Sequence, residues 1–157
     1  MPLLYVKVTP DRLTVRNIKT GQQISEVPEL AISRGVKKQV VLGFGAGARK
    51  AAVGQQSEVV NPLAHPRTLV GDFTVGEVLL KAFIHEVHRK ALFSLSPRIV
   101  MHPLGSPEGG FTQIERRALR EMAVGAGAAE VVLWVGRELS DQEVQSEKVL
   151  KSEGARQ

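Results

Sequence analysis

Apolar and polar residues alternate along the first third of the chain, which is the pattern of half-buried β-strands. Turn-forming stretches, Pro10-Asp11 and residues 19–22 among them, separate the apolar runs. The expected strands are residues 3–8, 13–18, 23–27, 30–32 and 38–42. The pattern therefore predicts a meander of strands joined by short turns.

The middle of the chain is less regular. Residues 45–52, rich in alanine and glycine, are expected to form a short helix. Residues 54–67 contain an Asn-Pro and a His-Pro pair, and such pairs mark turns and loops. We therefore expect a loop between the strands of the first third and the helices that follow.

Helical periodicity dominates the second half. Apolar residues three and four positions apart predict a helix over residues 72–92 and another over residues 112–124. A Thr or Ser followed three residues later by Glu is a capping box, and such boxes stand at Thr74, Thr112 and Ser140. The sequence therefore predicts three helix starts in this half.

Two apolar runs, residues 98–101 and 131–135, separate the expected helices. Strands that alternate with helices indicate a partly parallel sheet with right-handed crossovers. We predict one α/β domain, residues 1–151, in which helices flank a mixed sheet. Its last helix is mostly polar, and residues 152–157 are expected to form a frayed tail.

Composition narrows the chemistry. The chain has 157 residues, of which 43% are hydrophobic and 24% charged, an ordinary globular mixture. It contains no cysteine, which excludes disulfides and thiolate chemistry. No apolar run approaches the length of a membrane span, and the first residues lack the basic start of a signal peptide. A cytoplasmic location is expected.

The net charge of +5 permits an anionic partner. Aromatic residues make up 4% of the chain, too few for a base-stacking platform. Basic helix faces are conceivable from Lys81, His88, Arg89, Lys90, Arg116, Arg117 and Arg120. Glu115 and Glu121 disperse that charge, so solvated helix surface is favoured and a nucleic-acid or polyanion binder stays an alternative.

Two other patterns suggest ligands. Residues 43–47 (Gly-Phe-Gly-Ala-Gly) follow an apolar run like a dinucleotide-binding loop, but Ala48 replaces the third glycine and no acidic partner is obvious downstream. A structural turn is favoured there. His85 and His88 have the spacing of two metal ligands, but the neighbouring Arg89-Lys90 would repel a cation. Surface histidines are favoured.

One stretch carries a family resemblance. Residues 97–103 (Pro-Arg-Ile-Val-Met-His-Pro) precede residues 112–118 (Thr-Gln-Ile-Glu-Arg-Arg-Ala), then Ala-Gly-Ala at 126–128 and an apolar run. This pattern resembles the MreB family of bacterial actins, and weaker similarity extends upstream to residue 3. The resemblance implies an actin-like, ribonuclease H-like half-domain with a mixed sheet and helices. The family's second half has no counterpart in this sequence.

Departures from the family pattern affect the expected activity. The resemblance places an acidic and glycine-containing phosphate loop after the first strand, where residues 6–11 read Val-Lys-Val-Thr-Pro-Asp. The family's Glu-Glu-Pro motif is replaced by residues 136–139, Gly-Arg-Glu-Leu. Phosphoryl transfer depends on positioning and charge neutralisation together. We therefore expect no enzyme activity, no cofactor and no metal.

The resemblance suggests an interaction protein of the cell-shape cytoskeleton. The expected partner is MreB, another cell-shape protein or a second copy of the chain, and a weak nucleotide binder is a further alternative. Loss of the second half is expected to leave apolar surface at the strand ends. The predicted interface residues are Val8, Met101, His102, Val135 and Arg137.

Overall fold

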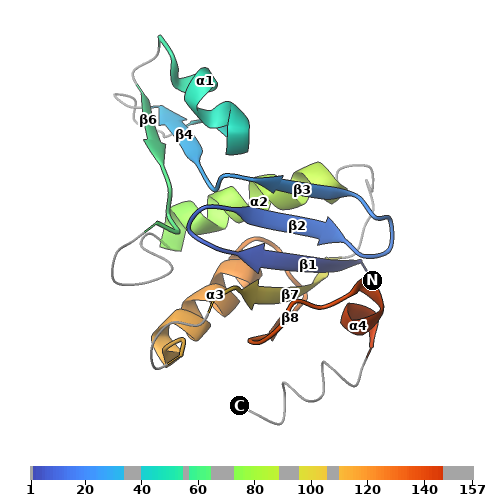
Figure 1. The fold of residues 1–157 in the computed structure, drawn as a ribbon. Helices are drawn as coiled ribbons and strands as arrows, with labels where there is room; N and C mark the ends of the chain where they lie inside the picture. Colours follow the sequence, from blue (N-terminus) through green and yellow to red (C-terminus); the bar gives the residue numbers. More distant parts are fainter. Residues whose placement is uncertain are drawn as a thin grey trace.

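A computed structural model describes residues 2–33, 40–54, 57–64, 73–88, 96–105 and 110–146. Within them lies a five-stranded sheet in the order β3-β2-β1-β7-β8, with helices packed against it (Figure 1). Its strands are β1 (Leu3–Val8), β2 (Leu13–Asn17), β3 (Gln23–Glu26), β7 (Arg98–Pro103) and β8 (Glu130–Leu133). β1, β2 and β3 pair antiparallel, whereas β7 lies parallel to both β1 and β8. The predicted mixed α/β sheet with flanking helices is confirmed.

The expected five-strand meander is divided between two sheets. β4 (Leu30–Ser33) lies between β5 (Val41–Phe44) and β6 (Ser57–Val60) in a separate three-stranded sheet. Pro28 precedes β4, and proline lacks the N–H that a continuing ladder needs. β6 falls within the predicted loop at 54–67 and was missed because its antiparallel pairing with β4 is a contact between segments distant in sequence.

The described helices follow the periodicity. The turn η1 (Gly45–Gly47) leads into α1 (Ala48–Ala52), as expected for residues 45–52. α2 (Phe73–His88) and α3 (Gln113–Gly125) are the two long predicted helices. The last predicted helix is shorter than expected: α4 spans Asp141–Gln145 and ends at Ser146, whose backbone is extended. Residues 147–157 lie outside the described residues.

The capping boxes at Thr112 and Ser140 are confirmed, but the one at Thr74 is wrong. α2 already includes Phe73, so Thr74 lies inside the helix instead of at its cap. The predicted ends of this helix, residues 72 and 89–92, lie outside the described residues. None of the helices in the described part of the chain has the length and apolar character needed to cross a bilayer.

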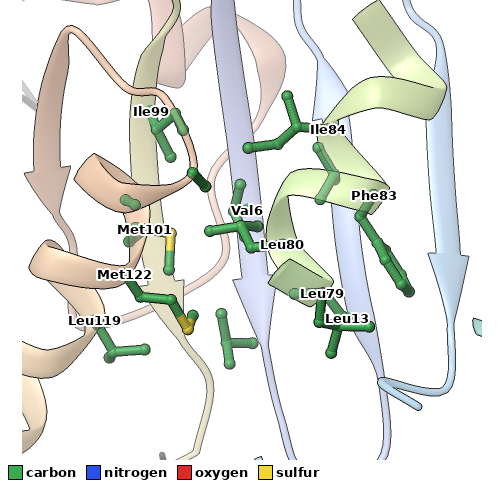
Figure 2. Close-up of a cluster of buried hydrophobic side chains, with 14 of the residues drawn as sticks. Val6, Leu13, Leu79, Leu80, Phe83, Ile84, Ile99, Met101, Leu119 and Met122 are labelled. Atoms are coloured by element: carbon green, nitrogen blue, oxygen red, sulfur yellow. The ribbon is translucent and has the colours of Figure 1, made fainter. Parts of the chain in front are cut away.

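The main core lies between one face of the five-stranded sheet and helices α2 and α3. Figure 2 shows Val6 and Met101 from the sheet meeting Leu80, Leu119 and Met122 from the two helices. The three-stranded sheet joins this core through Phe44, whose ring centroid lies 5.6 Å from that of Phe83 on α2. One continuous apolar cluster therefore supports both sheets.

The opposite face of the five-stranded sheet carries a smaller apolar cluster. Successive residues of a strand point to opposite faces, so Leu3 and Tyr5 of β1 and Val100 of β7 point away from α2 and α3. Leu139 and Val144, from the chain beyond β8, cover them. We call this covering segment, residues 134–144, the strap.

Candidate functional site

The carboxyl ends of parallel strands are the usual ligand site of such sheets. In this chain a tight turn, residues 9–12, follows β1 there. The hydroxyl oxygen of Thr9 accepts from the backbone N–H groups of Asp11 (3.3 Å) and Arg12 (2.9 Å). The Thr9 N–H donates to the Arg12 carbonyl at 3.0 Å, and Pro10 has no N–H. Every backbone N–H of this turn is therefore bonded within it, and none is directed toward a phosphate.

The glycine-rich segment at 43–47 is likewise closed by the chain's own groups. The Glu26 carboxylate accepts from the Ala46 N–H at 2.8 Å, and the Gly45 N–H donates to the Glu29 carbonyl at 2.8 Å. Gly45 has φ +62°, and a side chain at this position would collide with Glu26. The N–H groups of Gly45 and Ala46 are thus already bonded within the chain, as in a structural turn.

The strap is anchored to the sheet by a chain of buried hydrogen bonds. The Leu139 N–H donates to the Tyr5 hydroxyl at 3.1 Å, and Tyr5 Oη lies 2.6 Å from His102 Nδ1. His102 Nε2 lies 2.9 Å from the Gly136 carbonyl oxygen, which can only accept. His102 therefore carries its proton on Nε2, and the Tyr5 hydroxyl donates to Nδ1.

Burial shapes the acidity of both side chains in this network. Desolvation lowers the pKa of His102 below its ordinary value of 6.5, outweighing the bond to the Gly136 carbonyl, which favours the charged ring. Desolvation likewise raises the pKa of Tyr5. Both groups are therefore neutral near pH 7.

Ion pairs surround this network at the rim of the strap. Lys7 Nζ on β1 lies 3.0 Å from a Glu138 carboxylate oxygen. Arg16 on β2 meets Asp141 through two N–H···O contacts of 2.9 Å each. The contact with Lys7 lowers the pKa of Glu138, and the contact with Arg16 lowers that of Asp141.

A further ion pair lies within the strap itself, between Arg137 and Glu143. The hydrogen bonds from Arg137 and from the Ser140 backbone lower the pKa of Glu143 to about 2. Gly136 permits the path of the strap, since its φ of +147° lies in a region that favours glycine. The strap is thus bonded at the rim and apolar at its centre.

Three of the five predicted interface residues lie inside the chain. Val8 and Met101 are fully buried in the main core, and His102 is fully buried beneath the strap. Val135 is half-buried, and Arg137 is exposed but paired with Glu143. The chain itself therefore covers these three positions, which do not contribute to an open surface.

Two of the exposed large apolar residues lie on α3. The side chains of Ile114 and Val124 are 80% and 57% exposed on this well-formed helix. Arg117 and Glu121 lie between these two residues along the helix and are one turn apart. They form an ion pair with an Nε–Oε1 distance of 3.1 Å. We call these four residues the α3 outer face. This face could not be predicted from the sequence, because an apolar residue at helical spacing is normally assigned to the core.

The other candidate residues show no ligand site. Within the described ranges, no group of three or more His, Cys, Asp or Glu side chains is placed to hold a metal. His85 is exposed on α2, and the side chain of His88 lies outside the described residues, as do Arg89 and Lys90.

Each of the three arginines of α3 forms a bond within the chain. Arg116 donates to the Phe111 carbonyl, Arg117 to the Glu121 carboxylate and Arg120 to the Val131 carbonyl. Lys81 is exposed on α2. These contacts reduce the basic surface that the sequence suggested.

The fold is that of one actin-like half. MreB5 of Spiroplasma citri, solved with ADP, matches 85% of this chain and 38% of its own length with a TM-score of 0.65 and 19% identity. A non-polymerising mutant of MamK bound to AMPPNP matches 85% of this chain and 40% of its own, with a TM-score of 0.61 and 13% identity. At such identities the likeness concerns the fold alone.

The sequence establishes the family. The MreB/Mbl protein model matches residues 15–137, so the chain belongs to the MreB/Mbl family, as the resemblance predicted. Cell shape-determining protein MreB of Escherichia coli K12 is 47% identical over 66 residues, which are 41% of this chain and 18% of that protein. The Pasteurella multocida protein of that name is 43% identical over 65 residues, covering 41% and 17%. The chain thus matches less than a fifth of the length of these curated relatives.

Proposed function

We propose that this chain is a non-catalytic MreB-like module that binds another MreB-type chain through the α3 outer face. The observation that carries the proposal is the 80% exposure of Ile114 on a long, capped helix. Large aliphatic side chains at the centre or ends of such a face are typical anchors of protein interfaces. The closed turn at Thr9 and the closed glycine segment support the non-catalytic part of the proposal.

The arrangement of the α3 outer face favours a partner that presents the same helix. Ile114 and Val124 are equally far from Leu119 along the helix, and Arg117 and Glu121 are also equally far from it. Two copies packed antiparallel, with a two-fold axis that crosses the α3 outer face at the level of Leu119 along the helix, would therefore place Ile114 against Val124 at both ends. They would also place each Arg117 against the Glu121 of the other copy. The face is self-complementary, which an isologous interface requires.

The partner is accordingly a second copy of this chain or an MreB whose corresponding helix has a similar outer face. Charged residues are normally depleted at interface centres, because burying an unpaired charge is unfavourable. In this arrangement each Arg117 is paired with a Glu121 across the axis, so both charges are compensated. Charge pairing across the axis would also select the antiparallel over the parallel orientation, because parallel helices would place like charges together. The proposal thus fixes orientation as well as location.

The test compares two single substitutions. Ile114→Glu places a carboxylate at the centre of each apolar contact, and we expect association to weaken at least about tenfold. Val53→Glu is the matched control, because Val53 is 77% exposed but lies after α1, far along the chain from α3. Self-association is measured by sedimentation velocity over a concentration series, and binding to full-length MreB by co-sedimentation.

Wild type and Val53→Glu should behave alike in both assays, and Ile114→Glu should lose binding in at least one. Binding to MreB without self-association would assign the partner as MreB. If the wild-type chain binds neither itself nor MreB, or if Ile114→Glu binds as well as wild type, the proposed interface is wrong. Circular dichroism confirms that each variant keeps its helices.

A further inference from the structure

An apolar pocket lies where the three-stranded sheet meets α2, on other elements than the α3 outer face (Figure 1). Its volume is about 110 Å³. Five of the six described residues that line it are aliphatic and the sixth is a threonine; they are Leu30, Ile32, Val41, Thr74, Val75 and Val78. The described lining contains no charged side chain, so the pocket suits an apolar group.

A β-bulge contributes to this pocket. The register of β5 against β4 shifts between Ala31 and Ile32, which leaves Leu42 as an extra residue of β5. Residues directly opposite each other in a sheet share a face, so Val41 instead of the larger Leu42 lies beside Ile32. The shorter side chain leaves space between β5 and α2 unfilled.

The mouth of the pocket is apolar as well. The lining residues Val41 and Val78 are 44% and 39% exposed, and Val40, next to Val41 in the chain, is 52% exposed. Three of the six large hydrophobic residues that are exposed in the described part of the chain thus belong to this rim. In protein interfaces, the side chains that carry most of the binding energy fill such pockets, and the contacts around them exclude water.

The size of the pocket decides between two kinds of occupant. Sites for drug-sized molecules have volumes of about 300–1,000 Å³ and enclose most of the ligand. This pocket is smaller, and two of its lining residues are partly exposed. Benzene binds in an engineered cavity of about 150 Å³, so a pocket of this order holds about one large side chain. The pocket therefore suits an anchor side chain better than a free metabolite.

Charge near the mouth narrows the chemistry of the partner. Lys81 is exposed three residues after Val78, on the same side of α2. No carboxylate in the described ranges forms an ion pair with it. Of the acidic residues nearby, Glu77 lies against Gly125 of α3, and Glu58 on β6 has an interaction of its own. An acidic residue beside the anchor would therefore meet an uncompensated positive charge.

We propose that this pocket is an anchor site for a partner polypeptide that inserts one large aliphatic or aromatic side chain and carries an acidic residue beside it. The site gives the chain a second contact surface, whose chemistry differs from that of the α3 outer face. A single anchor side chain supplies weak affinity, in the millimolar range. The rim of valines would exclude water around it.

Short synthetic peptides test the site by NMR of the methyl-labelled full chain. The probe is a capped peptide with one phenylalanine between two aspartates, and the matched control peptide has alanine in place of phenylalanine. We expect the probe to shift the methyl signals of Ile32, Val41 and Val78, while those of Val53 and Ile114 stay unchanged. The alanine peptide should bind at least about tenfold more weakly.

Two substitutions on α2 separate the anchor from the charge. Val78→Asp places a carboxylate at the mouth of the pocket, and we expect it to weaken the probe at least about tenfold. Lys81→Glu should weaken the probe and favour a peptide with lysines in place of the aspartates. Val53→Asp is the matched control, since Val53 is 77% exposed outside the pocket. Ile114→Glu should bind the probe like wild type, so the result is independent of the proposed function.

The inference is overturned if the probe leaves the pocket signals unchanged at millimolar concentration, or if the alanine peptide binds equally well. It is also overturned if Val78→Asp folds and binds like wild type. Toluene that shifts these signals when no peptide does would make the pocket a small-molecule site and overturn the inference too. Circular dichroism checks the fold of each variant. The comparison of the two peptides on the wild-type chain decides alone if Val78→Asp does not fold.

Discussion

Thr112 illustrates how a single side chain holds local structure in this chain. Its hydroxyl accepts from the Glu115 N–H at 3.1 Å, and the Glu115 carboxylate accepts from the Thr112 N–H at 3.1 Å. The same reciprocal pair recurs at Ser140 and Glu143. Thr9 does comparable work in the turn after β1. Polar side chains thus satisfy the backbone groups that a ligand would otherwise need.

Thr112→Ala removes one half of the α3 capping box. We expect it to lower the free energy of unfolding by about 1 kcal/mol, because the Glu115 N–H at the helix start loses its hydroxyl acceptor. Association through Ile114 should stay at the wild-type level, since Thr112 precedes the helix and lies outside the α3 outer face. Urea unfolding and sedimentation velocity measure the two effects. Unchanged stability together with lost association would instead make Thr112 part of the interface.

Residue types alone could predict the capping boxes at Thr112 and Ser140, because their signal is local. The role of His102 could not be predicted from the sequence, because Tyr5 and Gly136 reach it through parallel pairing and a chain reversal. Val8 and Met101 were predicted to lie on the surface from a comparison with the family pattern. Alternation along β1 and β7 instead directs both into the core beneath α2 and α3.

At the scale of elements, local patterns predicted the helices and the five-stranded sheet well. β7 and α3 follow the strand and helix that the sequence indicated, and the parallel order follows from their alternation. The small sheet escaped prediction because β4 leaves the meander and pairs with β6. α1 covers one side of this small sheet, and its contact with β5 depends on a close approach at Gly43.

Gly43→Ala tests that approach. An added Cβ would lie 2.7 Å from the Cβ of Ala51, so α1 must move away from β5. We expect a loss of about 1–3 kcal/mol of stability, the usual cost of overpacking. Gly47→Ala is the matched control, because nothing lies within 4 Å of its added Cβ and its φ is −84°. Equal urea midpoints for the two variants would show that the α1–β5 contact adapts without cost.

At the scale of the whole molecule, the chain has the fold of one actin-like half, and the turn after β1 is bonded internally. Two segments correspond to the family's phosphate loop and to its Glu-Glu-Pro motif. The first, residues 6–11, includes part of this turn, and the second, residues 136–139, lies in the strap. Side chains in both segments bond to groups of the chain itself. The family and the fold are thus MreB-like. The site geometry favours interaction over nucleotide chemistry, which is the basis of the proposed function.

Mg-ATP should therefore not stabilise the chain. A ligand at a hundredfold excess over its dissociation constant would add about 2.7 kcal/mol to the free energy of unfolding. We expect no change in the thermal midpoint at about millimolar Mg-ATP, because no backbone N–H of the turn after β1 is available. Differential scanning fluorimetry measures the shift, with full-length MreB as the positive control. A clear rise for this chain would restore the nucleotide-binding alternative.

The two covers of the five-stranded sheet lie on opposite faces, with α2 and α3 on one and the strap on the other. A pair joined at α3 would therefore carry its two straps on its outward sides. A chain immobilised on a sensor surface, or labelled with a dye, through its strap side would keep α3 free to engage a partner. Attachment through α3 would block that partner while leaving the strap and the Tyr5–His102 contact beneath it undisturbed.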